Sequence, residues 1–121
     1  MTDKELLELA ARAAGIEGEY AELHQSCGDQ LVRGIDEGCL PVWWCPLDDD
    51  GDALRLAVKI GIDILRTETV VEAIAALPPY INIQTEPPVA PFGIELIGND
   101  AYAATRRAIV RAAAEIGSKM P

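Results

Sequence analysis

The chain has 121 residues, of which 20 are acidic and 10 are basic, so its net charge is −10. This length predicts one domain that is large enough to bury a core without disulfides or metals. The acidity argues against binding to nucleic acid or to anionic membranes, both of which need a basic face. Basic residues occur in every segment, and this diffuse pattern also argues against a nucleic-acid mimic.

The N-terminus is charged and is not followed by the apolar run of a signal peptide. No stretch approaches the roughly 18 uninterrupted apolar residues of a membrane span. We therefore expect a cytoplasmic protein. In that reducing compartment the three cysteines are expected to be thiols.

The first predicted element is a helix over residues 3–14. Thr2 and Glu5 have the spacing of a capping box, in which each side chain bonds the backbone N–H of the other residue. Apolar residues then follow at helical spacing, and Gly15 suits the left-handed residue after a helix. The pattern predicts an amphipathic helix.

Residues 18–42 carry apolar residues at irregular spacing, interrupted by glycines. The pattern favours short strands at about 19–24, 30–34 and 40–44.

The same region contains His24, Cys27 and Cys39, and Cys45 follows closely. Zinc prefers four Cys or His ligands, usually in two close pairs. His24 and Cys27 have a suitable spacing, but Cys39 and Cys45 lie far apart for a second pair. We favour buried thiols and a surface histidine, and these four residues stay as secondary metal-ligand candidates. No metal or other cofactor is predicted.

A helix over 52–60 is predicted at the centre of the chain. Pro46 favours an extended chain before it, and the acidic run Asp48–Asp52 suits a helix start, where carboxylates accept from free N–H groups. Gly61 suits the helix end. An EF-hand would need a glutamate six residues after Gly51, where alanine stands, so we interpret the acidic run as a cap.

Residues 62–65 are expected to form a loop or strand after that helix. Residues 67–77 fit the spacing of both a helix and a strand. The segment 92–97 alternates like a strand and is expected to be the last one.

The last predicted element is a helix over 100–116 that begins at Asp100 and ends before Gly117. Its apolar stripe is mostly alanine, which allows close packing. Arg107 and Arg111 lie one turn apart away from most of that stripe. They are candidates to pair with carboxylates on the surface or to bind an anion.

The segment Trp44–Lys59, WCPLDDDGDALRLAVK, resembles the phage ABA sandwich family, as do Ala13–Ile16 and Ala104–Ala113 in the same order. The resemblance covers about half of the chain. It implies helices flanking a sheet and a phage or prophage origin with a bacterial host, but no established activity. It also favours a strand at 67–77 that pairs with 80–85. The chain departs from the family at Cys45, where asparagine is common.

We expect an α/β (α+β) single domain, a three-layer α-β-α sandwich with an antiparallel or mixed sheet and helices on both faces. Phosphate-binding loops and HExxH are absent from the sequence, so no catalytic residue is predicted. The leading hypothesis is a non-enzymatic phage or prophage accessory protein. It would bind itself as a homo-oligomer, or bind a host defence or regulatory protein. The alternative is a protein that sequesters a nucleotide-like ligand. For both we take Trp43, Trp44, Arg107 and Arg111 as contact candidates. A zinc protein or enzyme using His24 and the cysteines is a third hypothesis.

Overall fold

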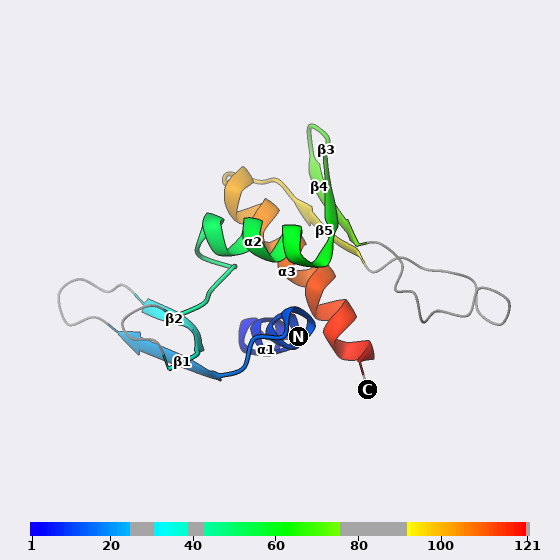
Figure 1. Cartoon of the computed structure of the whole chain (residues 1–121). Coiled ribbons are helices and arrows are strands. Elements are labelled where there is room, and N and C mark those ends of the chain that lie inside the picture. The colour runs from blue at the N-terminus through cyan, green and yellow to red at the C-terminus, as the bar shows by residue number, and fades with distance from the viewer. Residues whose placement is uncertain (25–30, 39–42, 76–91, 121) are drawn as a thin grey trace, which may run out of the picture.

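The computed structural model describes residues 1–24, 31–38, 43–75 and 92–120 (Figure 1). In chain order the described elements are α1 (Asp3–Ala14), β1 (Glu19–His24), β2 (Leu31–Asp36), α2 (Asp50–Ile60), β3 (Ile62–Arg66), β4 (Val70–Ala75), β5 (Phe92–Leu96) and α3 (Ala101–Lys119). The described strands form two antiparallel sheets, β1-β2 and β3-β4-β5. The predicted α+β class with three helices is confirmed. The predicted three-layer α-β-α sandwich is not observed, because the described strands form two separate sheets and not one sheet with helices on both faces.

The predicted helix starts are explained by side chains that cap free N–H groups. Thr2 and Glu5 form the expected capping box on α1, whose bounds match the predicted 3–14. The central helix begins two residues before the predicted 52–60, because Asp49 is the N-cap and accepts from the N–H of Asp52. Gly61 ends it in the left-handed conformation, as expected.

The prediction that α3 ends before Gly117 is wrong. The helix continues to Lys119, and Gly117 is a buried residue inside it. An added Cβ at this position would overlap the carbonyl oxygen of Leu9 in α1. The glycine therefore permits close contact between α1 and α3 and does not mark a helix end.

The β1-β2 hairpin matches the prediction at 19–24, whereas the predicted strand 30–34 is shifted to Leu31–Asp36. Of the predicted strand 40–44, Trp44 extends the hairpin through two main-chain hydrogen bonds with Ile35, at 2.8 and 3.0 Å. Residues 39–42 lie outside the described residues.

Strand β4 is the centre of the second sheet and pairs with β3 on one side and β5 on the other. The strand interpretation of 67–77 is thus confirmed for Val70–Ala75. Residues 80–85, which we expected to pair with it, lie outside the described residues. Over Val71–Ile74 β4 is paired with β3 at one edge and with β5 at the other.

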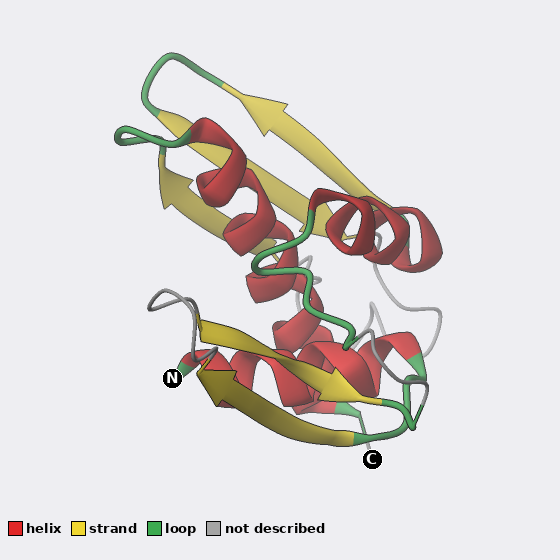
Figure 2. Cartoon of the chain, turned by 90° about the vertical axis from the view of Figure 1, so that its left-hand side faces the viewer, coloured by secondary structure: helices red, strands yellow, loops and turns green. Residues whose placement is uncertain are grey.

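The three helices lie between the two sheets (Figure 2). The hairpin packs beside α1, α1 packs on α3, and α3 crosses β4 and β5. Small residues make this arrangement dense, since most of the buried positions of α3 are alanines: Ala104, Ala108, Ala112, Ala113 and Ala114. Among the described helices, none is long and apolar enough to cross a membrane.

Candidate functional site

One face of the three-stranded sheet is not covered by any described helix. The opposite face packs against α3. Gly93 identifies it, because an added Cβ at this position would overlap the Ala108 carbonyl oxygen of α3. Val71 and Ala73 share that helix-facing side and are fully buried. Because side chains alternate along a strand, the other side, here called the open face, is composed of the remaining residues. These are Asp63, Leu65, Val70, Glu72, Ile74, Phe92, Ile94 and Leu96.

The open face is largely apolar and accessible. Leu96 is 77% exposed, Leu65 is 55% exposed and Phe92 is 54% exposed. The register joins these side chains across the strands, since Leu65 lies opposite Glu72, and Glu72 opposite Ile94. Apolar residues scattered singly on a surface are ordinary, but six neighbours on one sheet face form a patch of the kind that marks interaction sites.

The charges on the open face have one sign. Asp63 and Glu72 carry its two carboxylates, and no Lys or Arg stands on this face in the described strands. Arg66 lies on the helix-facing side, opposite Val71. A surface with this pattern attracts a partner that combines apolar and basic groups.

The predicted contact residues Arg107 and Arg111 are paired with carboxylates beneath the sheet. Arg107 contacts Asp3 at 2.9 Å and Glu95 at 3.5 Å. Arg111 contacts Glu95 at 2.8 Å and also donates to the carbonyl oxygen of Ile94 at 3.0 Å. From the sequence, these arginines were expected either to pair with carboxylates or to bind an anion. In the structure they form ion pairs that attach α3 to β5 and α1.

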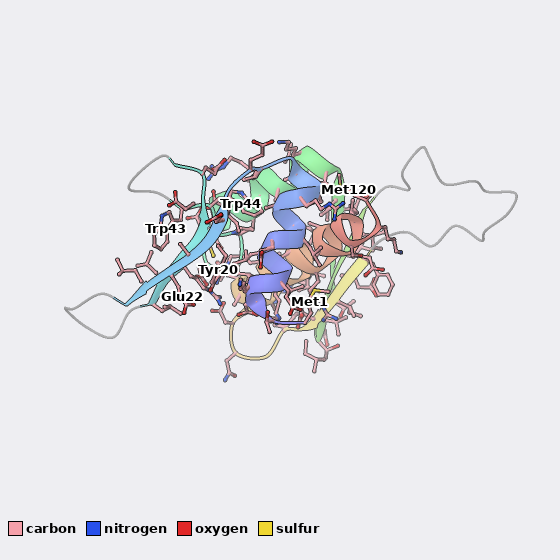
Figure 3. The ribbon with its side chains drawn as sticks, turned by 90° about the horizontal axis from the view of Figure 1, so that it is seen from below. Met1, Tyr20, Glu22, Trp43, Trp44 and Met120 are labelled. Atoms are coloured by element: carbon pink, nitrogen blue, oxygen red, sulfur yellow. The ribbon has the colours of Figure 1, made fainter. Side chains whose placement is uncertain are left out.

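The predicted tryptophans lie beside the β1-β2 hairpin, on the opposite side of the helices from the open face (Figures 2 and 3). Trp44 is only 8% exposed and belongs to the core. Trp43 is half-buried, and its buried indole N–H has no hydrogen-bond partner among the described residues. Within the described parts of the chain, no hydrogen bond joins either tryptophan to Arg107 or Arg111.

The acidic run before α2 has structural roles. Asp49 caps the helix, and Asp50 pairs with Arg106 of α3 at 2.6 Å. Asp52 is buried and accepts the N–H of Cys45 at 3.0 Å, which holds the preceding turn against the helix. The interpretation of this run as a cap is thereby supported by contacts.

Arg33 links the hairpin to the other parts of the molecule. Its guanidinium donates two hydrogen bonds to Asp48, at 2.9 and 3.0 Å, and one to Asp3 at 2.7 Å. These bonds favour the ionised carboxylates, so the hydrogen bond from Arg33 lowers the pKa of Asp48 and of Asp3 below the ordinary range. The cluster connects β2, α1 and the turn before α2.

Of the four secondary metal-ligand candidates, the structure describes the side chain of Cys45 alone, so the zinc hypothesis stays a prediction. Cys27 and Cys39 lie outside the described residues, as does the side chain of His24. Burial raises the pKa of Cys45 to about 11, and the nearby charge of Asp48 adds to this, so the thiol stays protonated at neutral pH. Within the described ranges no group of three or more His, Cys, Asp or Glu side chains could hold a metal ion.

Two hollows lie at the C-terminal end of α1, where the chain leaves the helix. The larger has a volume of about 500 Å³ and is lined partly by charged residues of both signs, Glu8, Arg12 and Glu17. The smaller has a volume of about 160 Å³ and contains cations but no carboxylate. Its lining residues are Ala14, Ile16, Trp44, Arg55, Leu56 and Lys59.

Sequence reasoning missed both the open face and the small hollow. The alternation at Phe92, Ile94 and Leu96 was visible, but the sequence does not reveal which side of the strand α3 covers. Arg55 and Lys59 were visible as a pair one turn apart on α2. Their position beside Trp44 depends on how α1 ends against α2, which no local pattern indicates.

Comparisons of the chain with models of known protein families, with curated proteins and with solved structures found no match. The resemblance to the phage ABA sandwich family therefore stays a prediction.

Proposed function

We propose that the protein is a non-enzymatic interaction module that binds a partner protein through the open face of its three-stranded sheet. One observation carries this proposal. Strand β5 directs two large apolar side chains, Ile94 and Leu96, away from the helices, while Gly93 and Glu95 face the helices. A strand that served only the core of this domain would have the opposite pattern.

The charge of the open face favours a basic partner over a second copy of the chain. A two-fold pairing of this face with itself would bring Asp63 and Glu72 of both copies together with no cation between them. Burying unpaired carboxylates is costly. A partner with Lys or Arg beside its apolar residues would pair with both carboxylates.

The dimensions of the open face fit one amphipathic helix. Three strands about 4.8 Å apart give a face roughly 14 Å wide, and strands of about five residues give it a length near 17 Å. A helix is about 10–12 Å in diameter, and about 11 residues at 1.5 Å per residue span the same length. A helix laid on this face would add the helical layer that the described part of this sheet lacks.

The resemblance to phage proteins supports a phage or prophage accessory role for this module. In that role the partner would be a component of host defence or regulation that presents a basic amphipathic helix. The homo-oligomer foreseen from sequence would use another surface, or would appear as a competing result in the experiment below.

The experiment uses a fluorescent 18-residue amphipathic helical peptide with leucines on one face and lysines at the flanks. We expect saturable binding in fluorescence anisotropy, and no binding of the same peptide with glutamates at the flanks. Burying Leu96 contributes about 1.5–3 kcal/mol, so Leu96→Asp should weaken binding roughly ten-fold or more. The added negative charge would by itself attract the basic peptide. A loss of affinity in Leu96→Asp therefore reports the lost apolar contact and not a charge effect.

The matched control is Tyr102→Asp, which introduces the same charge at a side chain on α3 that is 73% exposed. It should bind the basic peptide as the wild type does. Equal weakening by both variants, or binding that Leu96→Asp leaves intact, would remove the open face from the function. A dimer in analytical ultracentrifugation that Leu96→Asp dissociates would show that a second copy is the occupant, and would overturn the proposal.

A further inference from the structure

The small hollow between α1 and α2 combines an apolar floor with a basic rim. Ala14, Trp44 and Leu56 are buried and form its floor. Arg55 and Lys59 lie one turn apart on α2 and form the rim. The two sets of residues meet because Gly15 turns the chain sharply after α1, which brings Ile16 back over α2 and Trp44.

Some nitrogens of the basic side chains at this rim have no carboxylate partner within the described residues. Arg55 pairs with Asp52 at 2.7 Å and stands 3.7 Å from Asp49, through a single nitrogen. Lys59 forms no hydrogen bond or ion pair with any residue in the described parts of the chain. In a chain with a net charge of −10, most basic side chains have carboxylates available nearby. A basic rim without a carboxylate in its lining attracts an anion.

The volume limits the size of the ligand. An apolar protein cavity of about 150 Å³ holds one benzene molecule. The hollow here, about 160 Å³, can therefore take a single ring or a short branched chain. Sites for drug-sized ligands measure about 300–1,000 Å³, so this hollow alone is too small for the nucleotide-like ligand considered from sequence.

From these observations we infer that the hollow is a binding site for a small organic anion, a carboxylate with an apolar body about the size of a benzene ring. The ring lies against the Trp44 indole and Leu56, and the carboxylate meets Lys59 and the free nitrogens of Arg55. Aromatic packing binds the ring of the ligand, and an ion pair beside an apolar surface binds its carboxylate. This site is separate from the open face and does not depend on the proposed function.

The test is a titration of the ¹⁵N-labelled protein with phenylacetate, followed through the indole N–H signals of the two tryptophans. Phenylacetamide, which has the same shape without the charge, is the matched ligand. We expect a saturable shift of the Trp44 signal with phenylacetate, a much smaller one with phenylacetamide, and little change at Trp43. Replacing each tryptophan by phenylalanine in turn assigns the signals.

The variant Lys59→Gln should raise the dissociation constant about five-fold, the effect of one exposed ion pair near 1 kcal/mol. Lys59→Gln combined with Arg55→Gln should bind phenylacetate no better than phenylacetamide. Lys4→Gln removes the same charge from exposed α1 and should change nothing. Equal shifts with both ligands, equal shifts of both tryptophans, or an unchanged affinity in Lys59→Gln would each overturn the inference. The lysine and arginine variants are first compared with the wild type by their ¹⁵N spectra, since these side chains are exposed and the fold should persist.

Discussion

Replacing Gly117 by alanine should destabilise the protein, although alanine is the better helix residue. Gly117 lies inside α3 where the helix passes α1. An added Cβ would stand 2.8 Å from the carbonyl carbon of Leu9 and would overlap its oxygen. These are backbone atoms of a helix, so they cannot rotate aside as a flexible side chain would. The two helices would have to separate.

The size of the effect follows from two opposing contributions. Helix propensity favours alanine over glycine by about 1 kcal/mol. Overpacking a dense contact costs about 1–3 kcal/mol, and the backbone clash places Gly117→Ala near the upper end of that range. The net loss is then about 2 kcal/mol of unfolding free energy. For a domain of this length it should lower Tm by roughly 8 °C.

The assay is thermal and urea unfolding followed by far-UV circular dichroism, with Gly51→Ala as the matched control. Gly51 is also helical, but an added Cβ there would meet only the ends of the Asp49 and Arg55 side chains, at 3.1 and 3.2 Å. Gly51→Ala should therefore be neutral or stabilising by up to about 1 kcal/mol. If Gly117→Ala melts at or above the wild-type temperature, α1 and α3 do not pack as closely as described.

Three further results are expected. The pKa of Asp48 lies below its ordinary value of 3.8 because of Arg33, so this pair stabilises the fold above pH 3.8 and loses its effect as the pH falls through the lower folded-state pKa. Asp48→Asn should accordingly lose less stability than the wild type between about pH 6 and pH 3, measured by urea unfolding. In a variant whose other two cysteines are serine, Cys45 should react with a disulfide reagent at neutral pH only after denaturation, and fast labelling of the native protein would contradict its burial. Asp52→Ala should cost about 1–3 kcal/mol in the same unfolding assay, because the N–H of Cys45 loses its acceptor, and an unchanged stability would show that this bond is dispensable.

Local signals in the sequence were sufficient for the elements whose ends carry their own capping groups. Thr2 and Glu5 determine where α1 begins, and Gly61 determines where α2 ends. These groups act within one turn of the helix, so their spacing in the sequence is also their geometry in space. The strand at 19–24 was also predicted correctly, although its apolar residues are irregularly spaced.

The arrangement of the strands into two sheets depends on contacts between distant segments. The sequence showed the alternation in β5, but apolar residues on one side of a strand normally face the core. Here Gly93 faces α3 because only a glycine allows that helix so close, and Glu95 faces it because Arg107 and Arg111 lie there. Both reasons lie in α3 and not in the strand itself. The open face could be recognised only once α3 was placed.

For the candidate site residues too, the sequence showed local spacing but not the contacts between distant segments. Trp43 and Trp44 were chosen because large aromatic residues often form contacts, yet Trp44 is largely buried and extends the hairpin. Arg107 and Arg111 were correctly placed one turn apart, and both form ion pairs with carboxylates of β5 or α1. A side chain's partners are set by tertiary packing, which the periodicity of one helix does not contain.

The position of α3 also has a consequence for synthesis on the ribosome. This helix contacts α1, α2 and the three-stranded sheet, and it supplies many of the buried residues. Because it comes last among the described elements, the earlier helices and strands emerge without the surface on which they pack. We therefore expect folding to complete only after α3 has been translated, and the nascent chain to present its apolar helix faces to chaperones until then.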